Sequence, residues 1–167
     1  MENSGTKRLT MAAMFVAIGV ILGNVVYIPV GVSKCFPIQH AINVMSAVIL
    51  GPGYGVLIAF VISLLRNILG TGSLLAFPGS MIGALLAGLV YKYTKNKYIT
   101  SIAEVFGTGV LGGLIAFPVA KYFMGKEVAI FFFVYPFILS SIGGSLIAII
   151  ILKVMEEHTD ILSNSNN

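Results

Sequence analysis

Apolar residues fill six long runs of the chain, and short segments containing glycine, proline or lysine separate these runs. A helix needs about 20 apolar residues to cross about 30 Å of hydrocarbon. The pattern therefore predicts six transmembrane helices, at residues 9–27, 38–50, 54–69, 80–93, 99–123 and 128–154. The second run rises only about 20 Å. We expect this helix to be tilted or to start below the membrane surface.

Composition supports a membrane protein without a separate soluble domain. Of the 167 residues, 57% are hydrophobic and 10% are charged, whereas soluble globular proteins carry roughly 25% charged residues. We expect an all-α integral membrane bundle of six transmembrane helices that forms a single domain over residues 1–167. No nucleic-acid partner is expected, because the basic residues lie beside or between the apolar runs, where they orient a membrane protein.

The distribution of basic residues predicts the orientation. With the N-terminus in the cytoplasm, six lysines and arginines lie on the inner side and three on the outer side, with Arg66 inside a helix. This asymmetry predicts that both termini are cytoplasmic. Two segments, residues 28–37 and 70–79, contain prolines and glycines and are expected to be outer loops. Pro118 is expected to kink the fifth helix, and the polar tail after Glu156 is expected to fray.

Polar side chains gather on one face of the second predicted helix and on one stripe of the third, both near their outer ends. Ionisable groups inside a bilayer are costly, about 2.5–3.5 kcal/mol for a central arginine on insertion scales. We interpret the two stripes as the walls of an outward-facing pocket. The alternative is an interhelical hydrogen-bond network that only holds the helices together. The candidate ligand-binding side chains are Gln39, His40, Asn43, Arg66 and Asn67.

Aromatic residues cluster at the same outer level, and about half of them fit an interfacial belt. Phe36, Phe77 and Tyr135 are the candidates for stacking against a planar ligand ring.

Glu104, in the fifth helix, has two interpretations, a proton relay or a structural hydrogen bond to a neighbouring helix. Since His40 has no second ligand at metal-binding spacing, no metal site is predicted. No nucleophile–base pair or phosphate loop is present, so neither an enzyme nor a cofactor is expected.

Small residues at a spacing of four mark close helix contacts. Gly83-x-x-x-Ala87, Ala84-x-x-x-Gly88 and Gly109-x-x-x-Gly113 are expected to serve internal packing. Ala13-x-x-x-Ala17 lies near the cytoplasmic end of the first helix. This small face could pack inside the bundle or equally against a partner protein. The single cysteine, Cys35, excludes an internal disulfide.

Four segments resemble a known family. They are IPVGVSKCFPIQHAINV (28–44), SLLRNILGTGSLLAFPGSMIGALLAGL (63–89), EVFGTG (104–109) and FFFVYPFILSSIGG (131–144). With the Ala13-x-x-x-Ala17 face, the chain resembles the substrate-binding S components of energy-coupling-factor (ECF) vitamin transporters. More narrowly, it resembles the ThiW family, over nearly its full length.

The resemblance implies capture of a thiamine precursor, the thiazole moiety hydroxyethylthiazole, for uptake. It also implies partners, namely a membrane T component and two cytosolic ATPase subunits, and we then expect Ala13 and Ala17 to form the docking face for the T component. A small neutral heteroaromatic ring with a hydroxyl group suits aromatic walls and a few hydrogen-bonding groups. The pyrimidine moiety and thiamine itself are alternative ligands. A stand-alone secondary transporter is disfavoured, because the chain shows no internal repeat and Glu104 is its one candidate for ion coupling.

Overall fold

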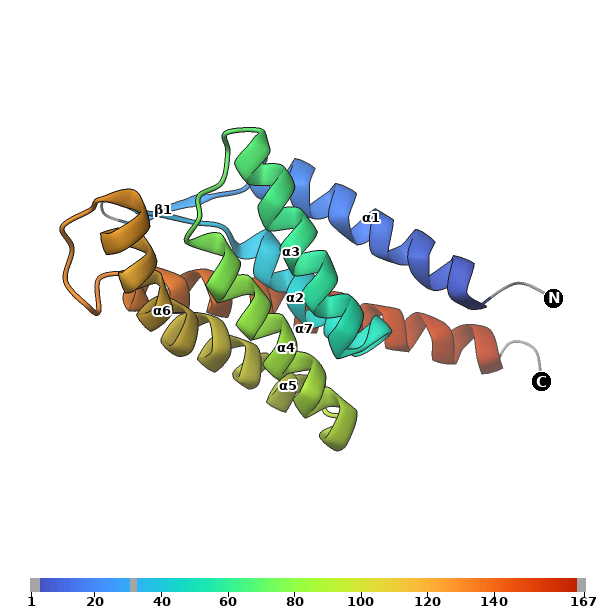
Figure 1. Cartoon of the computed structure of the whole chain (residues 1–167). Coiled ribbons are helices and arrows are strands. Elements are labelled where there is room, and N and C mark those ends of the chain that lie inside the picture. Colours follow the sequence, from blue (N-terminus) through green and yellow to red (C-terminus); the bar gives the residue numbers. More distant parts are fainter. Residues whose placement is uncertain (1–3, 31–32, 165–167) are drawn as a thin grey trace.

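The chain folds into a bundle of helices with one short hairpin at one end (Figure 1). The structure, a computed structural model, describes residues 4–30 and 33–164. Its first half consists of α1 (Ser4–Val25), β1 (Ile28–Val30), β2 (Ser33–Cys35), α2 (Pro37–Leu50), α3 (Pro52–Ile68) and α4 (Ala76–Thr94). A long helical segment follows, made of α5 (Lys97–Val105), the π-helix η1 (Phe106–Gly112), α6 (Gly113–Pro118) and the π-helix η2 (Val119–Phe123). The last element is α7 (Val134–Asn164).

Local sequence signals explain several helix ends. Pro37 and Pro52 stand in the first turns of α2 and α3, where a missing backbone N–H costs no hydrogen bond. Gly51 joins these two helices with φ +88°, a left-handed conformation that suits glycine. At the start of α5, the Asn96 side chain accepts hydrogen bonds from the backbone N–H groups of Tyr98 and Ile99.

The short helix α2 occupies the middle of the bundle. It contacts α1, α3, α4, α5 and α7. The helices around it direct many apolar side chains outward; Ile21 on α1 and Ile150 on α7, for example, are each 63% exposed. Lipid is as apolar as these side chains, so an apolar exterior is what a membrane bundle requires.

Three helical segments of the described chain are long and apolar enough to cross a membrane: Gly5–Val25, Lys97–Phe123 and Val134–His158. The helices α2 and α3 are apolar but shorter. The start of α1 and the end of α7 lie at the same end of the bundle (Figure 1). The β1–β2 hairpin, the α3–α4 connection and the connection before α7 lie at the opposite end (Figure 1).

The glycine patterns expected to serve internal packing are confirmed at the close helix contacts. A Cβ atom on Gly83 of α4 would lie 2.0 Å from the Thr108 Oγ1 of η1. A Cβ on Gly109 would lie 2.5 Å from the Ile138 side chain of α7, and one on Gly88 would lie 2.4 Å from the Cα of Pro52. These positions allow two backbones to approach more closely than any side chain would permit.

Several predicted boundaries were wrong. Part of the expected loop 28–37 is an antiparallel hairpin, in which Ile28 pairs with Cys35 and strand pairing satisfies backbone groups that a loop would leave open. Helix α4 begins at Ala76 instead of residue 80, and α7 begins at Val134 instead of residue 128. The C-terminal helix also continues to Asn164 instead of fraying after Glu156. At Pro118, where a kink was expected, the chain passes from α- to π-helix.

Candidate functional site

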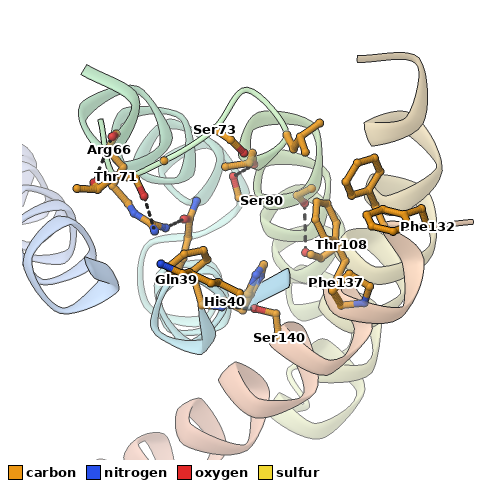
Figure 2. Close-up of a pocket in the computed structure, with 18 of the residues that line it drawn as sticks. Gln39, His40, Arg66, Thr71, Ser73, Ser80, Thr108, Phe132, Phe137 and Ser140 are labelled. Carbon is orange, nitrogen blue, oxygen red and sulfur yellow. Dashed lines mark hydrogen bonds between the residues drawn. The ribbon is translucent and has the colours of Figure 1, made fainter. Parts of the chain in front are cut away.

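A cavity of about 460 Å³ lies at the end of the bundle that carries the hairpin. Its wall is assembled from β2, α2, α3, α4, η1, α7 and the two connections that precede α4 and α7. Figure 2 shows the cavity with polar groups such as Arg66 and Gln39 on one side of the view and the rings of Phe132 and Phe137 on the other. The cavity is therefore amphiphilic.

Arg66 forms the centre of the polar side. It lies in the last turn of α3, lines the cavity and is only 2% exposed. Its Nη1 donates a hydrogen bond to Gln39 Oε1 at 2.7 Å and its Nε donates to Asn24 Oδ1 at 3.2 Å. Its Nη2 reaches the backbone carbonyl oxygen of Thr71 at 3.4 Å, and its guanidinium carbon lies 4.3 Å from the centre of the Phe36 ring. Three segments, namely α1, the start of α2 and the α3–α4 connection, thus hold this guanidinium in place.

Gln39 connects Arg66 to a row of hydroxyl groups. Its Nε2 donates to Ser63 Oγ at 2.9 Å, and Ser63 Oγ lies 3.0 Å from Ser80 Oγ. Ser80 in turn donates to the carbonyl oxygen of Ala76 at 2.7 Å. The side-chain amide of Gln39 is thereby fixed, with its oxygen on Arg66 and its nitrogen on Ser63.

A second network lies behind the cavity wall and is centred on Glu104, which is completely buried. His40 Nδ1 lies 3.0 Å from Glu104 Oε1, Asn43 Nδ2 donates to the same oxygen at 3.2 Å, and Thr108 Oγ1 donates at 2.8 Å. Ser141 Oγ donates to the other carboxylate oxygen. The structure shows hydrogen bonds between Glu104 and neighbouring helices, since His40 and Asn43 belong to α2 and Ser141 belongs to α7.

The aromatic side of the cavity comes mainly from the segment that enters α7. Phe132, Phe133 and Phe137 line the cavity. The Phe132 and Phe133 rings meet edge to face with centroids 5.1 Å apart, and the Phe133 and Phe137 centroids are 6.2 Å apart. Phe36 adds a ring on the Arg66 side.

The candidate side chains from the sequence fall into two groups. Phe36, Gln39, His40 and Arg66 line the cavity. The other four candidates, Asn43, Asn67, Phe77 and Tyr135, do not line it. Asn43 is fully buried behind the wall, where its Nδ2 also donates to the Ser80 carbonyl oxygen.

Asn67 holds the connection to α4, since its Nδ2 donates to the carbonyl oxygens of Ser63 and Ser73 at 2.8 and 3.0 Å. Phe77 packs against Phe60 with ring centroids 5.7 Å apart. Tyr135 is 65% exposed and does not line the cavity.

Sequence reasoning placed Phe132 and Phe133 among the outer aromatic residues but did not select them as stacking candidates. It missed Phe137 and two basic residues, Lys34 and Lys126, that also line the cavity. A partial signal was present, because Phe133, Phe137 and Ser140 are spaced so that they share one helix face. The Lys34 ammonium lies 4.8 Å from the Tyr27 ring centre. Among the described residues, no aspartate or glutamate lines the cavity, and no group of three or more His, Cys, Asp or Glu side chains is placed to hold a metal ion.

A shallow apolar groove runs between α1 and α3 on the side of the bundle. Ala13 and Ala17 are both exposed and line this groove, together with side chains such as Val16, Leu57 and Val61. The small residues that pack inward on α1 are different ones. Ala12 is 6% exposed, and a Cβ on Gly19 would lie 2.4 Å from the Ile62 side chain.

Comparison with known proteins gives two matches. The family model of the thiamine-precursor transporter protein (ThiW) matches residues 9–158. Among solved structures, the chain is similar to the S-component for biotin from an ECF-type ABC transporter, with a TM-score of 0.64 and 17% sequence identity over 94% of each chain. At this identity the likeness establishes a shared fold. The curated proteins contain no match.

Proposed function

The chain belongs to the ThiW family of thiamine-precursor transporter proteins, and from this premise we propose that it captures the thiazole precursor hydroxyethylthiazole as the S component of an ECF-type transporter. The family is one of transporter components, so the chain is a multi-pass protein of the cell membrane and not an enzyme. The proposal concerns the ligand, the partners and the arrangement in the membrane.

One observation supports the ligand: the amphiphilic character of the cavity. Hydroxyethylthiazole has a flat aromatic ring and a short tail that ends in a hydroxyl group. The Phe132 and Phe137 rings provide a surface for the thiazole ring. The hydroxyl group then meets the polar side, where Gln39, His40 and Arg66 offer hydrogen bonds. In this arrangement Asn43 and Asn67 position the wall and do not touch the ligand.

We also propose six membrane crossings with both termini in the cytoplasm and the cavity open to the outside. The start of α1 and the end of α7 lie at the same end of the bundle, which supports an even number of crossings (Figure 1). The excess of basic residues on that side supports its cytoplasmic location. An outward cavity is what capture of an external precursor requires.

The partners are proposed to be a membrane T component and two cytosolic ATPase subunits. The protein whose fold the chain shares is a component of an ECF-type ABC transporter. The exposed Ala13–Ala17 face supports a docking role, because small residues let the backbone of another helix approach closely in lipid.

The ligand proposal is tested by calorimetric titration of the purified chain in lipid nanodiscs with hydroxyethylthiazole, with the pyrimidine precursor and with thiamine. We expect hydroxyethylthiazole to bind most tightly. Tighter binding of either other compound would replace the thiazole assignment, and binding of none would refute the precursor class.

A pair of variants tests the position of the site. Phe137→Ala should weaken binding about tenfold or more, since a stacked ring contributes on the order of 1 kcal/mol beyond its buried area. Phe77→Ala removes the same side chain outside the cavity and should leave Kd unchanged. Equal effects of the two variants would place the ligand elsewhere.

A further inference from the structure

The positive charge of Arg66 has no negative partner among the described residues. The side chain is 2% exposed, and its three hydrogen-bond acceptors, on Gln39, Asn24 and Thr71, are all neutral. The described carboxylates that face a basic side chain are Glu104 beside His40, Glu156 beside Lys97 and Glu157 beside Lys153, so none of them pairs with Arg66. Buried charges in proteins are normally paired, and the requirement is stronger within a bilayer. Arg66 therefore has neutral acceptors and the Phe36 ring around it, but no counter-charge among the described residues.

The rest of the cavity adds positive charge instead of cancelling it. Lys34 and Lys126 line the same cavity. The Glu104 carboxylate lies behind His40 and Thr108 and already has four hydrogen-bonding partners. It does not line the cavity, so it offers no free oxygen to a bound molecule.

The geometry of Arg66 leaves room for a second set of bonds. A guanidinium group carries five N–H groups, and the three contacts above use one on each nitrogen. One N–H therefore remains on each of the two terminal nitrogens. A pair of such N–H groups matches the two oxygens of a carboxylate or phosphate.

We propose that the cavity binds its ligand as an anion, a heteroaromatic ring whose short tail ends in a carboxylate or a phosphate monoester held by Arg66. This inference rests on the proposed capture of a thiazole precursor, and it replaces the neutral hydroxyl tail of hydroxyethylthiazole by an acidic one. The Phe132 and Phe137 rings lie on the opposite side of the cavity from Arg66 (Figure 2). A molecule with an aromatic ring at one end and a charged tail at the other can therefore contact both sides at once. A ring with a permanent positive charge, such as the thiazolium of thiamine, is disfavoured because Arg66, Lys34 and Lys126 would repel it.

The test compares four compounds that share one thiazole ring, titrated into the unmodified chain in uncharged nanodiscs. They are the neutral alcohol, its phosphate monoester, a carboxylate with a tail of matching length, and the N-methylated cationic alcohol. At least one anion should bind ten or more times more tightly than the alcohol, and the cation should bind most weakly. The stronger of the two anions identifies the acidic group.

The outcomes separate the inference from the proposed function. If the alcohol binds as tightly as both anions, the inference is wrong and the proposed function stands. If none of the four compounds binds, both are wrong. Tightest binding by the cation would likewise overturn the charge assignment.

A charge-supplying variant tests the role of Arg66 directly. Gln39→Glu places a carboxylate oxygen where the amide oxygen now lies, 2.7 Å from Arg66 Nη1. The ratio of anion to alcohol affinity should then fall from tenfold or more to near one, and a retained preference would overturn the proposal. Lys121→Gln is the matched control, because Lys121 is an exposed cation that does not line the cavity, and it should keep the ratio. If Gln39→Glu does not fold, the four-compound series still decides.

Discussion

His40 and Glu104, 64 positions apart in the chain, meet with the Nδ1 of the imidazole 3.0 Å from the Oε1 of the carboxylate. His40 lines the cavity, and Glu104 lies completely buried behind it. The contact joins α2 to α5 and links the ligand-facing wall to the polar interior of the bundle. Its effect on stability can be measured separately from ligand binding.

Glu104→Gln is expected to destabilise the protein. The carboxylate accepts hydrogen bonds from Asn43, Thr108 and Ser141 in addition to its contact with His40. A glutamine would present an amide nitrogen to at least one of these donors. Breaking a buried charge network typically costs about 3 kcal/mol or more. The thermal denaturation midpoint in detergent should therefore fall.

Glu157→Gln serves as the control for this measurement. Glu157 pairs with Lys153 at 3.8 Å on the exposed end of α7. Surface pairs of this kind contribute roughly 0–1 kcal/mol. If both variants shift the midpoint equally, the Glu104 network does not stabilise the bundle.

Gly83→Ala is expected to disturb the contact between α4 and η1. The added Cβ would lie 2.0 Å from Thr108 Oγ1 and 3.0 Å from Glu104 Oε1. Overpacking a filled interior costs about 1–3 kcal/mol, measurable as a lower denaturation midpoint. Gly53→Ala adds the same methyl group on α3, where nothing lies within 4 Å, and should have little effect. A tolerated Gly83→Ala would mean that the two helices separate easily.

Cysteine labelling tests the proposed orientation. Cys35 is 2% exposed, its Sγ donates to the Pro136 carbonyl oxygen, and burial raises the pKa of its thiol. Because the thiolate is the reactive form, the unmodified chain should react slowly with a maleimide at pH 7. The native cysteine thus provides a low background for introduced ones.

Tyr122→Cys and Tyr93→Cys place thiols at opposite ends of the bundle, at positions 74% and 80% exposed. With a membrane-impermeant maleimide on intact cells, Tyr122→Cys should be labelled. Tyr93→Cys should be labelled only after the membrane is permeabilised. The reverse pattern would invert the proposed topology.

Bulky substitutions on α1 test the docking face. Ala13→Trp or Ala17→Trp should prevent co-purification with the T component and abolish uptake, because a large ring keeps the partner backbone away. Ligand affinity of the isolated chain should remain intact, since neither residue lines the cavity. Met14→Trp is the control, as Met14 is 58% exposed but lies outside the groove. Loss of ligand binding in both alanine variants would show that this face is internal.

The residue pattern was sufficient to predict the helices and part of the cavity wall. Runs of apolar residues are required to cross a membrane, so the pattern located the helices to within a few residues, apart from the start of α7 and its C-terminal end. Polar side chains in such runs need a reason, and this rule identified Gln39, His40 and Arg66, all of which line the cavity.

Which aromatic rings face the cavity, and which polar groups lie behind it, became known only from the packing of the helices. In a soluble protein, hydrophobic periodicity shows which face of a helix points inward. Here lipid and protein interior are equally apolar, so the pattern does not specify how each helix is rotated. Phe77 therefore turned out to pack on Phe60, while Phe137 lines the cavity. That no described carboxylate lies beside Arg66 depends in the same way on contacts between helices that are distant in the chain, which residue spacing does not encode.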